Sequence, residues 1–316
     1  MSLPQPSPEA STHSRTLVAA ITREIGDRGG WMSFARFMEI VLYLPGFGYY
    51  SAGARKFGAA GDFVTAPEMT PFFGRALAHQ VAQIMDASRP LVLEVGAGSG
   101  RLAADLLLEL ERIGNLPQRY DILDLSADLR ERQQATLAAS APHLLPRVNW
   151  LDRLPEEFSG VVVANELLDA MPAHVVAWRE DGIFERGVQL DAAGGFTWNE
   201  RPASGALLAA AAEIGAQCSL PPGYESEISL AARAWAGEWG HRLRCGALLL
   251  IDYGFPRREL YHQQRGRVTL LCHYRHHPHR DPFYLPGLQD VTVHVDFTAI
   301  IAAADAGKPL RVVADE

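Results

Sequence analysis

Apolar and polar residues alternate along this chain in blocks whose period changes between that of a strand and that of a helix. Four short apolar runs, bounded by Gly, Pro or polar residues, predict buried strands at residues 91–95, 120–126, 160–169 and 246–254. Apolar stripes at helical spacing predict two helices that face the core, one with Phe73, Leu77, Val81 and Ile84 and one with Leu102, Leu106, Leu110 and Ile113. Strands that alternate with helices predict an α/β fold with a doubly wound, mostly parallel sheet.

The region before the first predicted strand carries helical and loop signals. Residues 1–14 are rich in Pro and Ser and predict a disordered tail, whereas residues 15–29 have helical spacing. Thr70 and Pro71 form an N-cap and first-turn pair for a later helix. We therefore expect residues 15–89 to form an N-terminal helical and loop region that acts as a lid.

A long segment between the third and fourth predicted strands has a different pattern. Its alternating apolar residues are interrupted at Asp181-Gly182 and Gly194-Gly195, which predicts hairpins. We expect this insertion to serve as a lid or substrate platform. The expected domain limits are residues 173–245 for the insertion and residues 90–172 and 246–316 for the main domain, with a short last strand at residues 310–314.

Composition narrows the functional classes. The 316 residues carry 29 basic and 37 acidic side chains, a formal charge of −8 that gives no electrostatic footprint for nucleic acid. No apolar stretch approaches the roughly 18 residues of a spanning helix, so membrane insertion is not expected. Three separated cysteines without a CxxC pair indicate a reducing compartment. The N-terminus lacks an apolar signal region and makes a poor presequence, so we expect a bacterial cytoplasm, or a mitochondrial matrix in a eukaryote.

The stretch LVLEVGAGSGRLAADLL is a strand, a glycine-rich turn and a helix in succession. It contains the pattern ExGxGxG, formed by Glu94, Gly96, Gly98 and Gly100, and has Arg101 where a dinucleotide fingerprint needs Gly or Ala. Glycines at the end of a strand let the backbone approach a ligand closely. A carboxylate at Glu94 would hold a positive group, such as the amino group of an amino-acid-like ligand.

Asp124 closes the second predicted strand, 24 positions after Gly100. In an open α/β sheet this position lies beside the glycine-rich turn and can accept hydrogen bonds from both ribose hydroxyls of a nucleoside. The turn, the acidic residue and the lack of a phosphate-cradling lysine fit S-adenosyl-L-methionine (SAM) better than NAD or ATP. The alternative interpretation of the glycines is a tight turn without a ligand.

Asn165 and Glu166 close the third predicted strand and are the first choice for positioning a methyl acceptor, and Asn165 is also assigned to the cofactor. A guanidinium acceptor needs carboxylates in a bidentate position, which Glu166 could supply. The alternative for Glu166 is an N-cap or first-turn carboxylate of a following helix. Asp169, three residues further on, fits a helix start as well as a catalytic role.

Other candidates are less clear from their residue types. Thr65 and Glu68, in the stretch TAPE, are assigned to the cofactor as a lid contact, with a solvated turn as the alternative for Glu68. Tyr49 and Tyr50 could stack on a ligand or pack in the core. Asp252, at the end of the fourth strand, could border the acceptor pocket or form a turn.

The stretch CHYRHHPHR gathers one cysteine, four histidines and two arginines, at Cys272, His273, His276, His277, His279, Arg275 and Arg280. Such a cluster can hold a metal ion. It has no second cluster at the usual spacing, and its arginines oppose a cation, so we assign no metal. A loop that borders the substrate pocket or binds an acidic partner fits better.

Several blocks in order resemble the MidA-like family of SAM-dependent methyltransferases, which includes the mitochondrial complex I assembly methyltransferase. These blocks are LYLPGFGYY, GDFVTAPEMTPFFG, LEVGAGSGRLAADLL, ANELLDAMPAH, LLLIDYG and CHYRHHPHRDPFYLPGLQDVTVHVDF. The resemblance implies a class I methyltransferase fold and methylation of a protein arginine on the quinone-site core subunit of respiratory complex I. It also implies SAM contacts from Glu94, Gly96, Gly98, Gly100 and Asp124, and an NELLD block at Asn165, Glu166 and Asp169.

The chain departs from the resemblance at its C-terminus, where AGKPLRVVADE ends the sequence soon after the VDF helix. Three functions fit the sequence. The first is a protein arginine methyltransferase, with the complex I core subunit as its protein partner and a homodimer as an assembly to test. The second is a methyltransferase for another acceptor, such as a small molecule. The third is a SAM-binding or structural assembly factor that does not catalyse.

Overall fold

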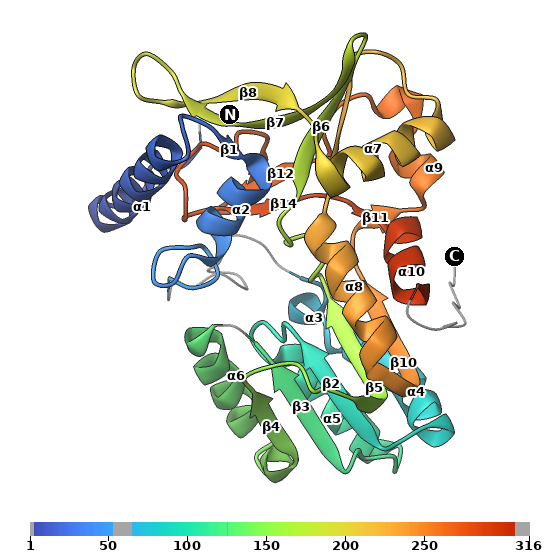
Figure 1. The fold of residues 1–316 in the computed structure, drawn as a ribbon. Helices are drawn as coiled ribbons and strands as arrows, with labels where there is room; N and C mark the ends of the chain where they lie inside the picture. The colour runs from blue at the N-terminus through green and yellow to red at the C-terminus, as the bar shows by residue number, and fades with distance from the viewer. Residues whose placement is uncertain (1–2, 53–64, 125, 307–316) are drawn as a thin grey trace. The chain divides into compact units, whose positions relative to one another are not determined.

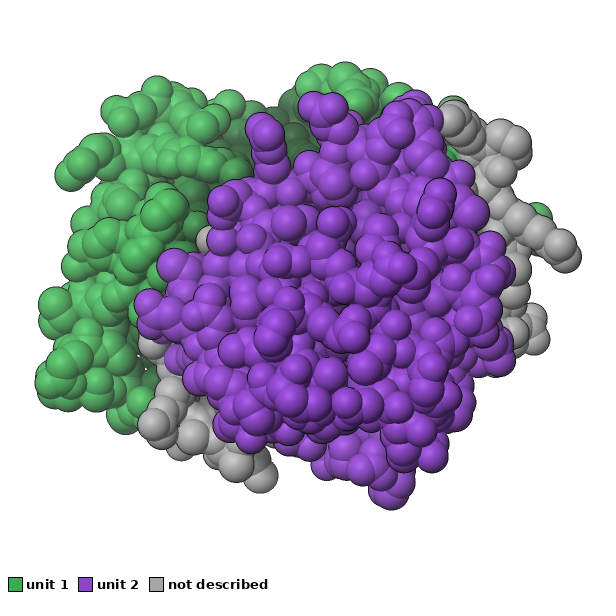
Figure 2. Space-filling view, turned by 90° about the horizontal axis from the view of Figure 1, so that it is seen from below, with its two compact units in different colours: residues 1–52, 168–237, 253–316 green, residues 53–167, 238–252 purple. Residues whose placement is uncertain are grey.

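The computed structural model describes residues 3–52, 65–124 and 126–306 (Figure 1). The chain forms two compact units, which Figure 2 colours separately. Unit 1 comprises residues 1–52, 168–237 and 253–316, and unit 2 comprises residues 53–167 and 238–252.

Unit 2 contains a five-stranded sheet in which every neighbouring pair of strands is parallel. Its strands are β2 (Leu91–Val95), β3 (Arg119–Leu123), β4 (Val148–Leu151), β5 (Phe158–Asn165) and β10 (Leu243–Ile251). The predicted parallel sheet is therefore confirmed, with strand ends shifted by a few residues. Strand β4 was not predicted, because its four residues include the exposed Asn149 and only one buried side chain, Val148.

The order of strands in the sheet, β10-β5-β2-β3-β4, differs from their order in the chain. From β2 the chain builds outward through β3 and β4, and then returns to the other side of β2 to form β5. The direction of winding thus reverses between β2 and β5. In open α/β sheets, ligands bind at such a switch point, outside the carboxyl ends of the strands.

The unit 2 helices are α3 (Ala66–Met69), α4 (Pro71–Ala87), α5 (Arg101–Arg112) and α6 (Ala127–Ser140), with a 3-10 turn at Leu145–Arg147. The predicted cap of α4 is confirmed, because Thr70 Oγ1 accepts a hydrogen bond from Phe72 N–H at 3.3 Å. Both predicted stripes pack into the core, where Val81 and Leu106 are fully inaccessible and Leu77 is half-buried. Complete burial of one such side chain contributes about 1.5–3 kcal/mol. These helices therefore form the core of unit 2 with the sheet.

Unit 1 is built on an antiparallel sheet with the order β1-β7-β6-β9, and β8 pairs with β7. Its strands are β1 (Met32–Ser33), β6 (His174–Arg179), β7 (Gly182–Leu190), β8 (Phe196–Pro202) and β9 (Tyr224–Ile228). Both predicted hairpins are confirmed, with turns at Asp181-Gly182 and Gly194-Gly195. Helix α7 (Gly205–Cys218) packs its apolar side against Val176 and Trp178 of β6.

The structure describes eleven further elements outside these two sets. They are α1 (Pro8–Asp27), α2 (Phe34–Tyr43), α8 (Leu230–Arg242), β11 (Gly254–Phe255), α9 (Arg257–Leu260), a 3-10 turn at Gln263–Arg265, β12 (Leu271–Tyr274), β13 (His277–His279), β14 (Asp290–Thr292), β15 (Val295–Asp296) and α10 (Phe297–Asp305). Helix α8 contains the residue at which the chain leaves unit 1 for unit 2.

The predicted disordered tail over residues 1–14 is wrong for residues 8–14, because α1 already begins at Pro8. Ser7 caps the helix by accepting a hydrogen bond from Ala10 N–H at 3.2 Å, and Glu9 lies in the first turn, where the helix dipole favours an acid. Leu17 and Ile21 are fully buried on its inner side. A capped helix start is itself polar and proline-containing, which is why its composition resembled that of a tail.

The residue boundaries of the two compact units differ from those of the predicted domains. Helix α4 lies within the predicted lid region, yet its apolar stripe packs into the core of unit 2. The segment after β10, from Tyr253 onward, groups with unit 1. The predicted strand at residues 310–314 lies outside the described residues. The assignment of lid and substrate roles to these regions remains a prediction.

Candidate functional site

The glycine-rich turn connects β2 to α5 at the switch point of the sheet. Gly96, Gly98 and Gly100 have φ angles of 72°, 53° and 81°, a region that L-residues with a side chain rarely adopt. A Cβ at Gly96 would lie 2.9 Å from Leu167 Cδ1, and one at Gly100 would lie 2.8 Å from Gln133 Cα. The glycines are therefore required by the backbone conformation and by packing within unit 2, in addition to any ligand contact.

Glu94 is buried in β2, with 2% of its surface exposed. Its Oε2 accepts a hydrogen bond from Tyr120 OH at 2.6 Å, and no basic side chain of the described residues forms an ion pair with it. Burial raises the pKa of Glu94 to about 7, and the nearby Asp124 charge acts in the same direction, whereas the Tyr120 bond opposes both. This carboxyl is therefore poised to ionise when a cation arrives beside it.

Asp124 follows β3 and is 7% exposed. Its Oδ1 accepts a hydrogen bond from Ser126 N–H at 3.0 Å, and its Oδ2 accepts one from Gln133 Nε2 at 2.8 Å. The two donors fix the plane of the carboxylate beside the glycine-rich turn, which is the position that the sequence predicted for a ribose contact. Gln133 was missed, because one buried glutamine in a helix leaves no periodic signal in the sequence.

Asn165 and Glu166 lie at the carboxyl end of β5, on the other side of the switch point. Glu166 has a φ of 48° although it is not glycine, a conformation that costs about 1 kcal/mol or more and persists only where the surroundings impose it. Its N–H donates to Ile251 O at 2.8 Å, which ties it to the end of β10. The next residue is held similarly, because Leu167 N–H donates to Asp252 Oδ2 at 3.0 Å.

The Glu166 side chain has a polar but largely buried environment. Burial raises its pKa, hydrogen bonds from Ala66 N–H and Asn165 lower it, and the Asp252 charge raises it again. Asn165 Nδ2 lies 3.5 Å from Glu166 Oε1, whereas Asn165 Oδ1 is buried without a hydrogen-bond partner among the described residues. Because buried polar atoms are nearly always bonded, this oxygen is available to a donor from a ligand or from a water molecule.

The alternative roles as helix starts are wrong for both Glu166 and Asp169, since no helix begins at either residue. Asp169 belongs to unit 1, where its backbone oxygen accepts a hydrogen bond from Val293 N–H at 3.0 Å. The charge of Asp169 also reaches Tyr50. Burial raises the pKa of Tyr50 well above its ordinary value, and the charges of Asp290 and Asp169 act in the same direction. The catalytic role assigned to Asp169 remains a prediction.

The α3 residues contact this part of unit 2. Glu68 Oε1 accepts a hydrogen bond from the Ser99 hydroxyl, which belongs to the glycine-rich turn. A contact with the turn thus replaces the alternative of a plain solvated loop. Thr65 is the N-cap residue of α3 but makes no capping bond with its side chain, and the following N–H, of Ala66, is the one that bonds to Glu166.

The remaining sequence candidates have structural roles in unit 1. Tyr49 is buried, and Tyr50 stacks on Tyr43 and donates its hydroxyl to Asp290 Oδ1 at 2.9 Å. The histidine-rich stretch forms the hairpin of β12 and β13. Among residues 3–52, 65–124 and 126–306, no group of three His, Cys, Asp or Glu side chains is arranged to hold a metal ion.

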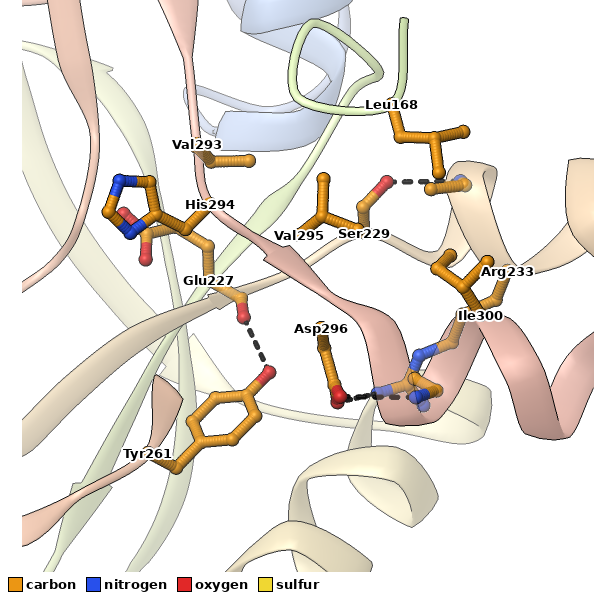
Figure 3. A pocket seen from close by; sticks show the side chains of 12 residues that line it. Leu168, Glu227, Ser229, Arg233, Tyr261, Val293, His294, Val295, Asp296 and Ile300 are labelled. Atoms are coloured by element: carbon orange, nitrogen blue, oxygen red, sulfur yellow. Dashed lines mark hydrogen bonds and ion pairs between the residues drawn. The ribbon is translucent and has the colours of Figure 1, made fainter. Parts of the chain in front are cut away.

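Figure 3 shows a small cavity inside unit 1, with a volume of about 20 Å³. The Tyr261 hydroxyl points to the backbone oxygen of Glu227 at 3.0 Å, and Asp296 faces Arg233 at 3.6 Å. The Glu227 carboxylate accepts hydrogen bonds from Thr269 N–H and Leu270 N–H. A cavity of this size holds about one water molecule, so it is not a nucleoside site.

The electrostatic character of the unit 2 site comes from five carboxyl groups near the carboxyl ends of its strands. They belong to Glu68, Glu94, Asp124, Glu166 and Asp252. Arg101, at the start of α5, is paired with Asp105 at 3.0 Å. Such a site favours a cationic ligand over a phosphate-bearing one.

In the described residues, no helix is both long and apolar enough to cross a bilayer.

Comparisons with known proteins agree with this geometry. A family model described as "Putative S-adenosyl-L-methionine-dependent methyltransferase" matches residues 76–313. The mitochondrial protein arginine methyltransferase NDUFAF7 homolog of Caenorhabditis elegans is 25% identical over 92% of this chain and 71% of its own length. Bos taurus NDUFAF7 is 28% identical over 85% of this chain and 64% of its own length. The chain thus spans about two thirds of these relatives.

Two solved structures from Burkholderia thailandensis have the same fold. One is a COG1565 superfamily member bound to S-adenosyl-homocysteine, with a TM-score of 0.93 and 50% identity over 97% of this chain and 80% of that one. The other is a native COG1565 structure, with a TM-score of 0.90 and 49% identity over 97% of this chain and 79% of that one. The predicted class I methyltransferase fold and the predicted cofactor class are therefore confirmed. By its sequence, its fold and its match over residues 76–313, the chain belongs to this family of S-adenosyl-L-methionine-dependent methyltransferases.

Proposed function

We propose that this chain is a SAM-dependent protein arginine N-methyltransferase, with the quinone-site core subunit of respiratory complex I as its acceptor. The observation that carries the proposal is the placement of carboxyl groups on both sides of the switch point, where Glu94 and Asp124 are buried and Glu166 is half-buried. Glu94 and Asp124 lie on the β2 and β3 side, and Glu166 lies on the β5 side. The arginine specificity draws on the relatives, which are named protein arginine methyltransferases.

The residues of unit 2 fit SAM by charge and by shape. Glu94 would bind the amino group, Asp124 would accept both ribose hydroxyls, and the glycine-rich turn would allow the nucleoside to approach the backbone. Thr65 and Glu68 would contact the cofactor from α3. When bound, SAM would supply a methyl group on a sulfonium, whose carbon–sulfur bond breaks as an in-line nucleophile bonds to the methyl carbon and S-adenosyl-homocysteine leaves. The protein's task is to align that nucleophile and exclude water.

Glu166 and Asn165 would position the acceptor. A guanidinium is planar and presents paired N–H donors that match a carboxylate, so Glu166 can orient it while Asn165 Oδ1 accepts a further N–H. The attacking nitrogen must lose a proton as the N–C bond forms. Burial raises the pKa of Glu166, which makes this carboxylate a better proton acceptor than a fully solvated one.

The proposed function is tested by incubating the purified chain with radiolabelled SAM and the isolated core subunit. We expect label on the subunit and a mass increase of one or two methyl groups on an arginine peptide. Label in small molecules from protein-free extracts, and none on the subunit, would replace this proposal by a small-molecule acceptor. Cofactor binding without any transfer would indicate an assembly factor. Light scattering of the same sample tests the predicted homodimer.

The affinity for S-adenosyl-homocysteine is expected to fall as the pH falls below 7. Burial raises the pKa of Glu94 to about 7, and a bound amino group favours the ionised carboxylate, so binding releases a proton. The affinity should drop by up to about tenfold per pH unit below that pKa and level off above it. Calorimetry between about pH 5.5 and 7.5 measures this slope. Glu94→Gln should flatten it, and an equal slope in both proteins would contradict the role of Glu94.

A further inference from the structure

The side chain of Gln133 joins three parts of the cofactor edge of unit 2. It is fully buried on α6 and carries hydrogen bonds on both ends of its amide. Its Nε2 donates to Gly98 O at 3.1 Å and to Asp124 Oδ2 at 2.8 Å, and its Oε1 accepts from Trp150 Nε1 at 3.0 Å. One amide thus contacts the glycine-rich turn, the proposed ribose carboxylate and strand β4.

The chemistry of these partners fixes the orientation of the amide. An indole N–H can only donate, so the group that faces Trp150 must be the amide oxygen. A carbonyl and a carboxylate can only accept, so the two hydrogens of Nε2 must face Gly98 and Asp124. Rotating the amide by half a turn would break all three bonds and leave buried groups unpaired, at a cost of about 1–3 kcal/mol for each.

From this network we propose that Gln133 is a positioning residue. It holds the Asp124 carboxylate and the Gly98 carbonyl in the positions that binding of a nucleoside ribose requires. The inference rests on the proposed function for the identity of the ligand. Asp124 holds one donor on each oxygen, from Ser126 and Gln133, so its plane is defined by these neighbours before any ligand arrives. Preorganised acceptors bind with less loss of conformational freedom.

The packing of α6 supports the same role. A Cβ at Gly100 would lie 2.8 Å from Gln133 Cα and 3.2 Å from Gln133 Cβ. The third glycine of the motif therefore allows α6 to approach the turn closely enough for the Gln133 amide to reach Gly98. In this arrangement Gly100 serves a contact within the protein, between the glycine-rich turn and α6.

The test compares two ligands on two variants. Gln133→Met keeps the size of the side chain and removes the amide, and Gln134→Met is the matched control, since Gln134 is exposed on the same helix. Calorimetry measures binding of S-adenosyl-homocysteine and of its 2′,3′-dideoxy analogue. Gln133→Met should weaken S-adenosyl-homocysteine binding about 10-fold to 100-fold, because hydrogen bonds to a charged acceptor are the strong ones. The analogue lacks the ribose hydroxyls, so the same substitution should lower its affinity by less than about threefold.

An equal loss for both ligands, or no loss for either, would overturn the positioning role. If Gln133→Met does not fold, Trp150→Phe removes the bond that orients the amide and keeps Gln133 itself. It should give the same pattern with a smaller loss, about threefold to tenfold for S-adenosyl-homocysteine. A wild-type chain that binds neither ligand would instead overturn the proposed function, so the two failures are distinguishable.

Discussion

Replacing Glu166 by glutamine is expected to lower the rate of methyl transfer by about a hundredfold or more, while the affinity for SAM changes less than about threefold. The amide keeps the shape of the side chain, but it presents an N–H to the guanidinium and can no longer accept its proton. The loss should therefore fall on kcat and on the KM for the protein acceptor. Steady-state kinetics with the acceptor and calorimetry with the cofactor separate these effects.

The matched control for this substitution is Glu156→Gln, since Glu156 is an exposed glutamate of the same unit. It should leave rate and affinity unchanged. A second variant, Glu166→Gly, removes the side chain and relieves the left-handed backbone at this position. It should be as inactive as Glu166→Gln without a lower melting temperature. A Glu166→Gln enzyme with wild-type kinetics would show that this carboxylate does not position the acceptor.

Replacing Asp124 by alanine is expected to weaken SAM binding by at least about a hundredfold, because two hydrogen bonds to a charged acceptor are lost. The substitution also leaves Ser126 N–H and Gln133 Nε2 without their carboxylate partner. Unfolding should therefore become easier by about 1–3 kcal/mol, the cost of unpaired buried donors. Calorimetry well below the melting temperature measures the affinity of the folded protein, and thermal denaturation measures the loss of stability.

Asp86→Ala serves as the control for Asp124, because Asp86 is an exposed aspartate of α4 in the same unit. It should change neither the affinity for SAM nor the melting temperature by a measurable amount. If Asp124→Ala kept the wild-type affinity, the ribose contact would have to be reassigned, and the positioning role of Gln133 would fall with it.

The sequence was most informative where structure and chemistry follow from short-range patterns. A buried parallel strand is a continuous apolar run, and a glycine-rich turn after it has few alternatives, so β2, the turn and α5 were predictable. Asp124, Asn165 and Glu166 were predicted as candidates because the carboxyl ends of parallel strands meet at one edge, and the structure places all three at strand ends. These predictions needed no knowledge of contacts between distant segments.

Features that depend on distant contacts were not predictable in the same way. Gln133 acquires its role only when α6 packs beside the glycine-rich turn. The αL conformation of Glu166 depends on its bond to the end of β10, which lies far along the chain. Likewise, the grouping of Asp169 with unit 1 follows from its contact with Val293, and nothing in the NELLD block indicates it.

The division of unit 2 into two chain segments has a consequence for making fragments of this protein. Residues 53–167 contain four of the five strands of the sheet, whereas β10 arrives only with residues 238–252. A fragment that ends at residue 167 would leave β5, with its Val161–Val163 run, as an open edge with unpaired backbone groups. Expressed alone, such a fragment should form insoluble aggregates, so domain dissection of this protein requires a rejoined chain in which β10 follows directly on the first segment.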